Sequence, residues 1–154
     1  MPSSIAEAGY ELSRSAIGEQ SERLGELRSR TGTLLAAASL AASLLGGQTV
    51  RGGELGILGG LALLGYLVCV GACIKVLLPH RLVFSFRGSA LIDAAHETGS
   101  EIDATLHAAT GWFESFLEEN RVELERLTQW YTIACLALGA ETVLWLLGAP
   151  DILG

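Results

Sequence analysis

Residues 31–50, TGTLLAAASLAASLLGGQTV, and residues 55–74, LGILGGLALLGYLVCVGACI, decide the fold of this chain. Neither run contains a charged residue, and only the polar joint RGGE, residues 51–54, separates them. At about 1.5 Å per residue, a helix of either length reaches roughly the 30 Å of a bilayer's hydrocarbon core. The pattern therefore predicts a transmembrane hairpin at residues 31–78. A buried hairpin of a soluble protein is the alternative, but little polar chain remains to enclose one.

The composition agrees with an integral membrane protein. Half of the 154 residues are hydrophobic, 18% are charged, and the mean hydropathy is +0.43. This balance is more apolar than that of typical soluble domains. The three cysteines, Cys69, Cys73 and Cys135, fall in apolar segments. We therefore expect them to pack as small apolar side chains rather than to form a disulfide or a zinc site.

Small residues repeat at four-residue spacing in both runs. The first run carries two adjacent stripes, Ala38, Ala42, Gly46 and Ser39, Ser43, Gly47, and the second run carries the pair Gly56, Gly60 and then the stripe Gly65, Cys69, Cys73. Residues four apart share a helix face, and small side chains let two backbones approach closely in lipid. The stripes predict tight helix packing. They serve either the hairpin alone or also subunit contacts and a pore lining.

Residues 1–30 have an amphipathic pattern that predicts a cytoplasmic stalk helix. Gln20, Leu24 and Leu27 step by three and four residues, and five glutamates lie on the polar faces. The segment is too long and too acidic for a cleaved leader, so we expect the first span to be a retained anchor. A helix lying on the membrane surface is the alternative, but acidic residues are not attracted to anionic lipid.

A basic juxtamembrane segment, residues 79–88, follows the hairpin, and Pro79 is expected to end the second helix. The basic side chains around it form a collar: Lys75, His80, Arg81 and Arg87. The collar is either the ordinary positive flank of a membrane span or an anion-binding site for a nucleotide or lipid phosphate.

Residues 89–126 predict one long cytoplasmic helix that continues into a third span, residues 127–149. Its apolar residues step by three and four, as in helices that pack side by side; they include Ile102, Leu106, Phe113, Phe116 and Leu124. We expect this heptad seam to join about three to six chains in a homo-oligomer. Trp130 and Trp145 lie near the two ends of the third span, where interfacial aromatics are common.

Orientation follows from the basic residues. With three crossings, nine of the ten lysines and arginines fall on one side, and only Arg51 falls on the other. This asymmetry places the N-terminus in the cytoplasm of a multi-pass protein of the cell inner membrane. The predicted fold is an all-α membrane protein with three transmembrane helices, a cytoplasmic stalk and a long cytoplasmic helix continuous with the third span. The long helix is acidic, which disfavours nucleic-acid binding.

Residues that carry chemistry are sparse. The chain has no Gly-rich phosphate loop and no nucleophile elbow, so we expect no enzyme, no catalytic residues and no cofactor. Asp93, His96, Asp103 and His107 fall broadly on one side of the long helix. We interpret them as a solvated face rather than a metal site, because metal binding needs ligands that converge from several helices.

Glu141 is the one charge inside the third span. It lies roughly 21 Å along the helix from Leu127, beyond the bilayer centre. A carboxylate near the centre costs about 2.5–3.5 kcal/mol, so this side chain should face protein or water. Two interpretations stay open. Glu141 is either an uncharged acid bonded to Ser39, Ser43, Thr142 or a backbone carbonyl, or it joins a ring of carboxylates along a cation path.

The stretch RSRTGTLL, residues 28–35, brings an arginine-bearing helix into a first span rich in small residues. Together with the short loop, the second span, the long helix and the last span, it resembles the small membrane effectors of bacterial anti-phage systems, the Pycsar transmembrane effector and SLATT-type families. The resemblance implies an oligomeric membrane protein whose opening harms the infected cell. It also implies a nucleotide second messenger or a signalling protein as partner, and no catalytic residues.

Two functions are therefore expected from the sequence. The first is a gated ion channel or membrane-disrupting effector. The second is a non-conducting membrane scaffold that presents a cytoplasmic helical bundle to a partner protein. Glu141 and the glycine stripes favour the channel, whereas the heptad seam suits either function.

Overall fold

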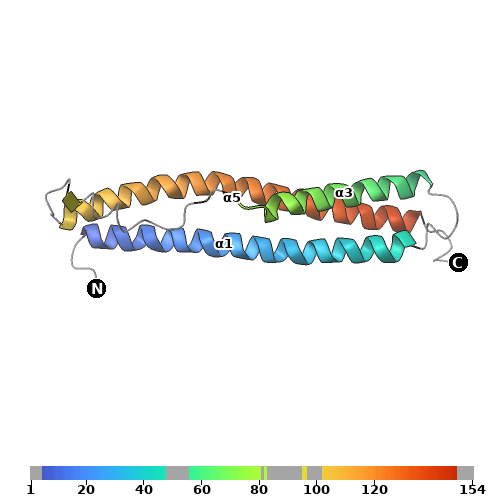
Figure 1. The fold of residues 1–154 in the computed structure, drawn as a ribbon, viewed down its shortest axis with the longest axis horizontal. Coiled ribbons are helices and arrows are strands. Elements are labelled where there is room, and N and C mark those ends of the chain that lie inside the picture. The colour runs from blue at the N-terminus through green and yellow to red at the C-terminus, as the bar shows by residue number, and fades with distance from the viewer. Residues whose placement is uncertain (1–4, 48–55, 81, 83–94, 97–101, 149–154) are drawn as a thin grey trace. The chain divides into compact units, whose positions relative to one another are not determined.

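A computed structural model describes residues 5–47, 56–80, 82, 95–96 and 102–148. Its elements are three α-helices and one π-helical segment: α1 (Ile5–Ala41), η1 (Ala42–Gly46), α3 (Ile57–Leu77) and α5 (Ile102–Leu147) (Figure 1). The described part of the chain contains no strand. The prediction of an all-α protein is thus confirmed.

Local chemistry explains where α3 begins and ends. Gly56 is extended, with φ −61° and ψ 170°, and the helix starts at the next residue. At the other end Leu78 leaves the helical region with ψ 148°, although its N–H still donates to the carbonyl of Ile74 at 2.9 Å. Pro79 follows, and a proline pushes the preceding residue out of the α region. The predicted end of this helix is confirmed.

The chain forms two compact units. The first contains residues 1–25 and 80–125, and the second contains residues 26–79 and 126–154. In the first unit, the start of α1 lies beside the start of α5 (Figure 1). The Tyr10 and Phe113 rings are 5.5 Å apart between centroids, and Nε2 of Gln20 donates to the carbonyl of Leu117 at 2.9 Å.

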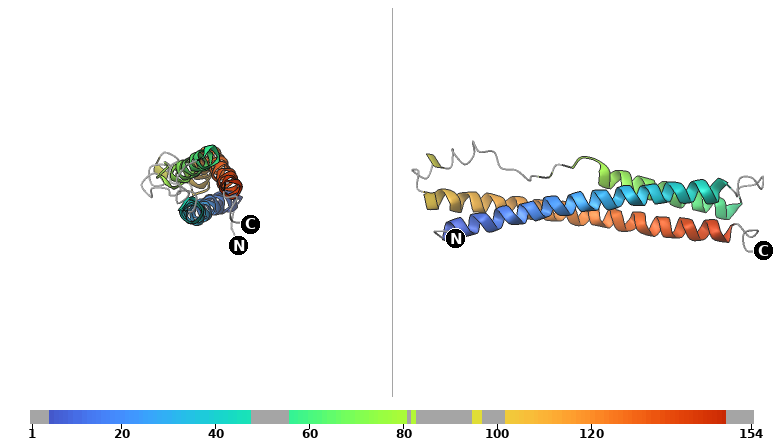
Figure 2. Two further views of the ribbon diagram at one scale, coloured as in Figure 1. Left: turned by 90° about the vertical axis from the view of Figure 1, so that its right-hand side faces the viewer. Right: turned by 90° about the horizontal axis from the view of Figure 1, so that it is seen from below.

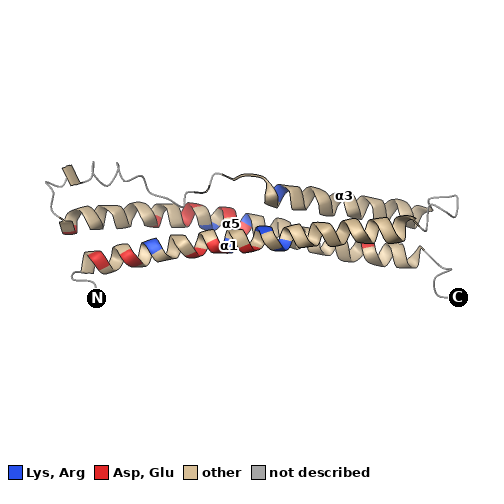
Figure 3. Ribbon diagram, turned by 60° about the horizontal axis from the view of Figure 1, so that its bottom comes forward, with Lys and Arg blue, Asp and Glu red and all other residues tan. Residues whose placement is uncertain are grey.

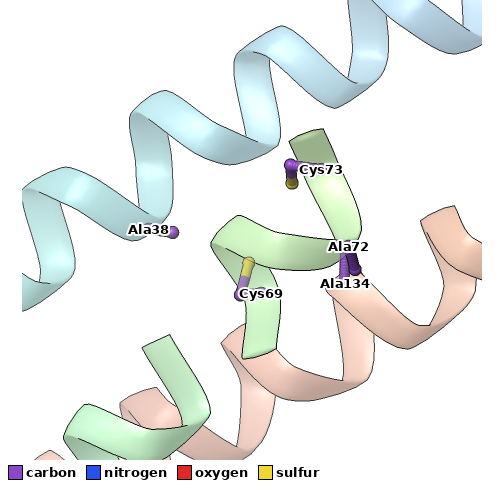
Figure 4. Packing of buried hydrophobic residues seen from close by; sticks show 5 residues of the cluster. All are labelled: Ala38, Cys69, Ala72, Cys73 and Ala134. Carbon is purple, nitrogen blue, oxygen red and sulfur yellow. The ribbon is translucent and has the colours of Figure 1, made fainter. Parts of the chain in front are cut away.

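The second unit packs α3 against the later parts of α1 and α5 (Figure 2). One cluster of its core consists of five small buried side chains, shown in Figure 4: Ala38 on α1, Cys69, Ala72 and Cys73 on α3, and Ala134 on α5. Small side chains let the three helix backbones approach closely, which is how helices associate in lipid. All three cysteines are free; Cys69 and Cys73 pack in the apolar core as predicted, whereas Cys135 is half-buried and lies outside this cluster.

Two helices are long and apolar enough to cross a membrane. Ile57–Leu77 has a mean hydropathy of 2.3, and an apolar window of Ile102–Leu147 reaches 1.5. Only 28% and 17% of these windows are buried, whereas the core helix of a soluble protein is mostly buried. The first predicted span does not qualify by the same test, because α1 ends at Ala41, η1 continues only to Gly46, and residues 48–50 lie outside the described part.

Exposed apolar side chains gather in the second unit. All but four of the exposed large hydrophobic residues belong to it, and the four exceptions are Ile5, Leu12, Ile102 and Val122. Figure 3 shows that the ribbon of α3 is almost free of charged residues. An apolar exterior around a core of small residues suits a hydrocarbon solvent, because lipid removes the drive to hide large apolar side chains.

One series of buried positions on each long helix recurs every seven residues. On α1 it is Ile17, Leu24, Thr31 and Ala38, and on α5 it is Phe113, Asn120, Leu127, Ala134 and Glu141. The other buried residues, Ser13 on α1 and Thr105, Ala109 and Trp145 on α5, precede or follow these series at four-residue steps. A seven-residue repeat is the signature of helices that pack side by side over a long distance. The repeat places Glu141 on the inner face of α5. Glu141 is therefore buried because of its position in this packing repeat, and not because of its neighbours in the sequence.

Candidate functional site

The carboxyl group of Glu141 is the centre of the candidate site. The residue is completely buried in the second unit, with 0% of its surface exposed. Its Oε1 accepts a hydrogen bond of 3.4 Å from Nε1 of Trp145, one turn further along α5. Its Oε2 has no hydrogen-bond partner in the described part of the chain. The site therefore holds one carboxyl oxygen that is enclosed but unsatisfied.

Gly65 of α3 makes room for this side chain. A Cβ at Gly65 would lie 3.3 Å from Cβ of Glu141 and 3.5 Å from its Cα. The two backbones thus approach each other at this point. Among the predicted packing glycines, Gly56 and Gly60 are exposed, and a Cβ on either would meet no described atom within 4 Å of it.

The inner face of α3 instead carries Gly59, Ala62, Cys69, Ala72, Cys73 and Val76. Gly56 and Gly60 do not pack within the chain, so their predicted role in subunit contacts stays a prediction; the helix is apolar all round, and periodicity cannot then tell its two sides apart. Of the three glycines predicted on the second run, Gly65 is the one that lies against another helix in the described part of the chain.

Trp145 closes the site from the other side. A Cβ at Gly46 of η1 would lie 3.2 Å from two ring atoms of Trp145, which is tighter than ordinary contact. The indole is only 4% exposed, so Trp145 lies inside the unit and not at its surface as an interfacial aromatic would. Glycine at position 46 therefore leaves space for the ring that bonds to Glu141.

The predicted serine partners do not meet Glu141. Ser39 and Ser43 are exposed, and Oγ of Ser39 donates to the carbonyl of Leu35 at 2.9 Å within its own helix. Oγ1 of Thr142 likewise donates to the carbonyl of Leu138 at 2.8 Å. Helical serine and threonine commonly bond to the carbonyl four residues back, and this satisfies the hydroxyl without a second helix. The predicted cluster of Glu141 with Ser39 and Ser43 is not formed.

The basic collar is only partly described. Lys75 is exposed on the last turn of α3. In the first unit Nε2 of His80 lies 3.7 Å from Oε1 of Glu123. Arg81 and Arg87 lie outside the described residues, as does nearly all of the segment at residues 79–88.

Sequence reasoning did not assign a role to Arg28 beyond its place in the RSRTGTLL stretch. Nη2 of Arg28 donates to the carbonyl of Leu78 at 3.3 Å, where α3 ends. A basic side chain at a helix C-terminus bonds the last carbonyls and complements the negative end of the helix dipole. The sequence does contain a clue to this hydrogen bond. Arg28 precedes the first span of the predicted hairpin and Leu78 follows the second, so both are expected at the same end of the hairpin.

The exposure of the side chains in the predicted heptad seam differs along α5. Phe113 is 5% exposed and Leu106, Phe116 and Leu124 are half-buried, whereas Ile102 is 75% exposed. Ile102 is the first residue of α5. Residues 89–94 and 97–101 of the predicted helix lie outside the described part.

The second unit brings no catalytic set together at Glu141. Its described neighbours are an indole, a helix backbone and small apolar side chains, so the arrangement can hold a proton or a cation but shows no nucleophile and base pair. His96, Asp103 and His107 are exposed, Asp93 lies outside the described residues, and no metal-binding group of three is found among the residues described. No protein-family model matches this chain, and no curated protein or solved structure is similar to it.

Proposed function

We propose that this chain is a non-enzymatic membrane effector of bacterial anti-phage defence, an oligomer that passes ions or breaks the permeability barrier of the inner membrane. It crosses the membrane three times, at residues 31–50, 55–74 and 127–149, with its N-terminus in the cytoplasm. Leu40 and Leu44 of the first run are 63% and 66% exposed, which suits a lipid-facing helix. A nucleotide second messenger or a signalling protein provides the cytoplasmic signal.

The observation that carries this proposal is the half-satisfied carboxyl group of Glu141. A buried polar group without a partner costs about 1–3 kcal/mol. An apolar side chain of similar volume would fill the same position without that cost. A carboxyl group at this place is therefore explained by a second arrangement of the helices, in which Glu141 faces a water-filled path. The described arrangement, in which Glu141 is enclosed, is the closed state.

The length of α5 gives the signal a route to the site. This helix has 46 residues and contains both Phe113, which packs on the stalk, and Glu141. A rotation or tilt at its cytoplasmic end is carried along the helix to the carboxyl group. The signal shifts the equilibrium only as far as it binds the open arrangement better than the closed one.

A scaffold is the second candidate function, and one observation favours it. The seam that was expected to join several chains is covered in part within one chain, through Tyr10 and Phe113 and through Gln20 and Leu117. A stalk whose apolar seam is covered within its own chain leaves its acidic exterior free to bind a partner protein. In this case Glu141 serves the packing of the bundle alone.

The deciding experiment is conductance of the purified protein in planar bilayers, with and without cyclic nucleotides. If Glu141 lines the path, Glu141→Gln changes ion selectivity or conductance while the oligomer keeps its mass. Glu125→Gln, on an exposed part of the same helix, is the matched control and should leave conductance unchanged. Silence of the wild type in every condition, with unimpaired membrane potential in cells that overproduce it, would favour the scaffold.

A further inference from the structure

The π turn η1 shifts the packing register of the first span by one residue. Buried positions on α1 recur every seven residues up to Ala38, and the next position of that repeat is 45. The buried residue is instead Gly46, eight residues beyond Ala38. A π turn contains one residue more than an α turn. The extra residue in Ala42–Gly46 therefore makes Gly46 the fully buried residue of the inner face, whereas Leu45 beside it is half-buried.

The exchange of Leu45 for Gly46 decides whether Trp145 fits. Even a Cβ at position 46 would come within 3.2 Å of two atoms of the indole ring. A leucine side chain on the inner face would occupy the space of the ring itself. The indole is in turn the donor to Oε1 of Glu141. Gly46, Trp145 and Glu141 thus form one chain of contacts that depends on the π turn.

We propose that η1 is a register switch for Glu141. When the π turn becomes an ordinary α turn, Gly46 rotates by about 100° about the helix axis, Leu45 takes its place, and the indole of Trp145 is expelled. The carboxyl group then loses its donor and is uncovered. This inference deepens the proposed function, on which it rests for the consequence that the path opens.

Two physical features make the element bistable. A single π turn is rare in proteins and frequently lies at a functional site, and the α form is the more common backbone arrangement. In a close-packed interior, either Gly46 or Leu45 can lie opposite Trp145, and arrangements between these two are not stable. Packing of the indole against Gly46 holds the π form, and backbone hydrogen bonding favours the α form.

The switch is tested through the environment of Trp145. Trp112→Phe and Trp130→Phe leave Trp145 as the single tryptophan, whose fluorescence is excited selectively in vesicles of phosphatidylcholine with brominated acyl chains. Gly46→Ala should expose the indole and so increase its quenching, because the added methyl group meets the ring. Gly47→Ala is the matched control, since a Cβ there meets no described atom within 4 Å, and it should leave quenching unchanged.

Deletion of Ser43 provides an independent test of the register switch. It removes one exposed residue from η1 and places Gly46 seven residues after Ala38 without a π turn. This variant should keep Trp145 protected and should resist activation. Equal quenching for Gly46→Ala and Gly47→Ala would overturn the switch, as would exposure of Trp145 after the deletion.

The outcome separates the switch from the proposed function, because quenching does not require conductance. If Gly46→Ala exposes Trp145 and the wild-type protein never conducts, the results support the register switch and refute the channel. If the protein conducts while Gly46→Ala leaves Trp145 protected, the channel stands and the switch fails.

Discussion

Replacing Gly65 by alanine probes how closely α3 packs against α5. The added Cβ would lie 3.3 Å from Cβ of Glu141, 3.5 Å from its Cα and 3.6 Å from the carbonyl oxygen of Ala137. Carbon atoms in optimal contact are about 3.5–4.0 Å apart. Two of the three neighbours are backbone atoms, which cannot rotate away as the end of a side chain would. The helices must therefore separate, and overpacking of this kind costs about 1–3 kcal/mol.

Gly60 on the same helix supplies the control, because a Cβ there meets no described atom within 4 Å. Both substitutions gain helix propensity alike, so the difference between the two alanine variants isolates the packing cost. We expect the free energy of unfolding of Gly65→Ala to be about 1–3 kcal/mol below that of Gly60→Ala. Equilibrium unfolding in mixed micelles, followed by tryptophan fluorescence, measures both values. Equal values would refute the close approach of the two backbones at Gly65.

Three further predictions concern other parts of the chain. Phe113→Ala should lower the free energy of unfolding by about 3–5 kcal/mol because the ring is 5% exposed, and thermal unfolding followed by circular dichroism in detergent checks this value. Arg28→Gln should speed amide hydrogen exchange in the last turn of α3, because the carbonyl of Leu78 loses a donor, and unchanged exchange would show that the bond is not formed in lipid. In a background without native cysteines, a membrane-impermeant thiol reagent should label a cysteine at position 154 from outside intact cells but not one at position 4, and the reverse pattern would contradict the orientation.

The helices themselves were predictable from the sequence. The charge-free run at residues 55–74 corresponds to α3, which spans Ile57–Leu77, and the proline that follows ends it. The seven-residue seam and the third apolar run correspond to one helix, α5. These features depend on hydropathy and on local backbone chemistry, and both can be read residue by residue.

The face that each helix turns inward was not predictable in the same way. Gly56 and Gly60 satisfy the four-residue rule as well as the buried pair Cys69 and Cys73 does, and only tertiary packing selects between the two sides. Nor does the π turn have a local signature. It becomes visible only when the step from Ala38 to the next buried residue is compared with the repeat before it.

The polar residues on the inner faces differ in one respect that bears on Glu141. Polar side chains at heptad positions commonly specify register, at some cost in stability. Thr31 is fully buried and its hydroxyl donates to the carbonyl of Leu27 at 2.7 Å, and Asn120, 2% exposed, also has an interaction partner. A purely structural role is therefore enough to explain Thr31 and Asn120. Glu141 occupies an equivalent position but keeps one oxygen without a partner, and register alone would not require a group with that penalty. The proposed second arrangement, in which Oε2 gains a partner, would account for this carboxyl group, and the proposed register switch would place the moving part of the molecule between η1 and Trp145.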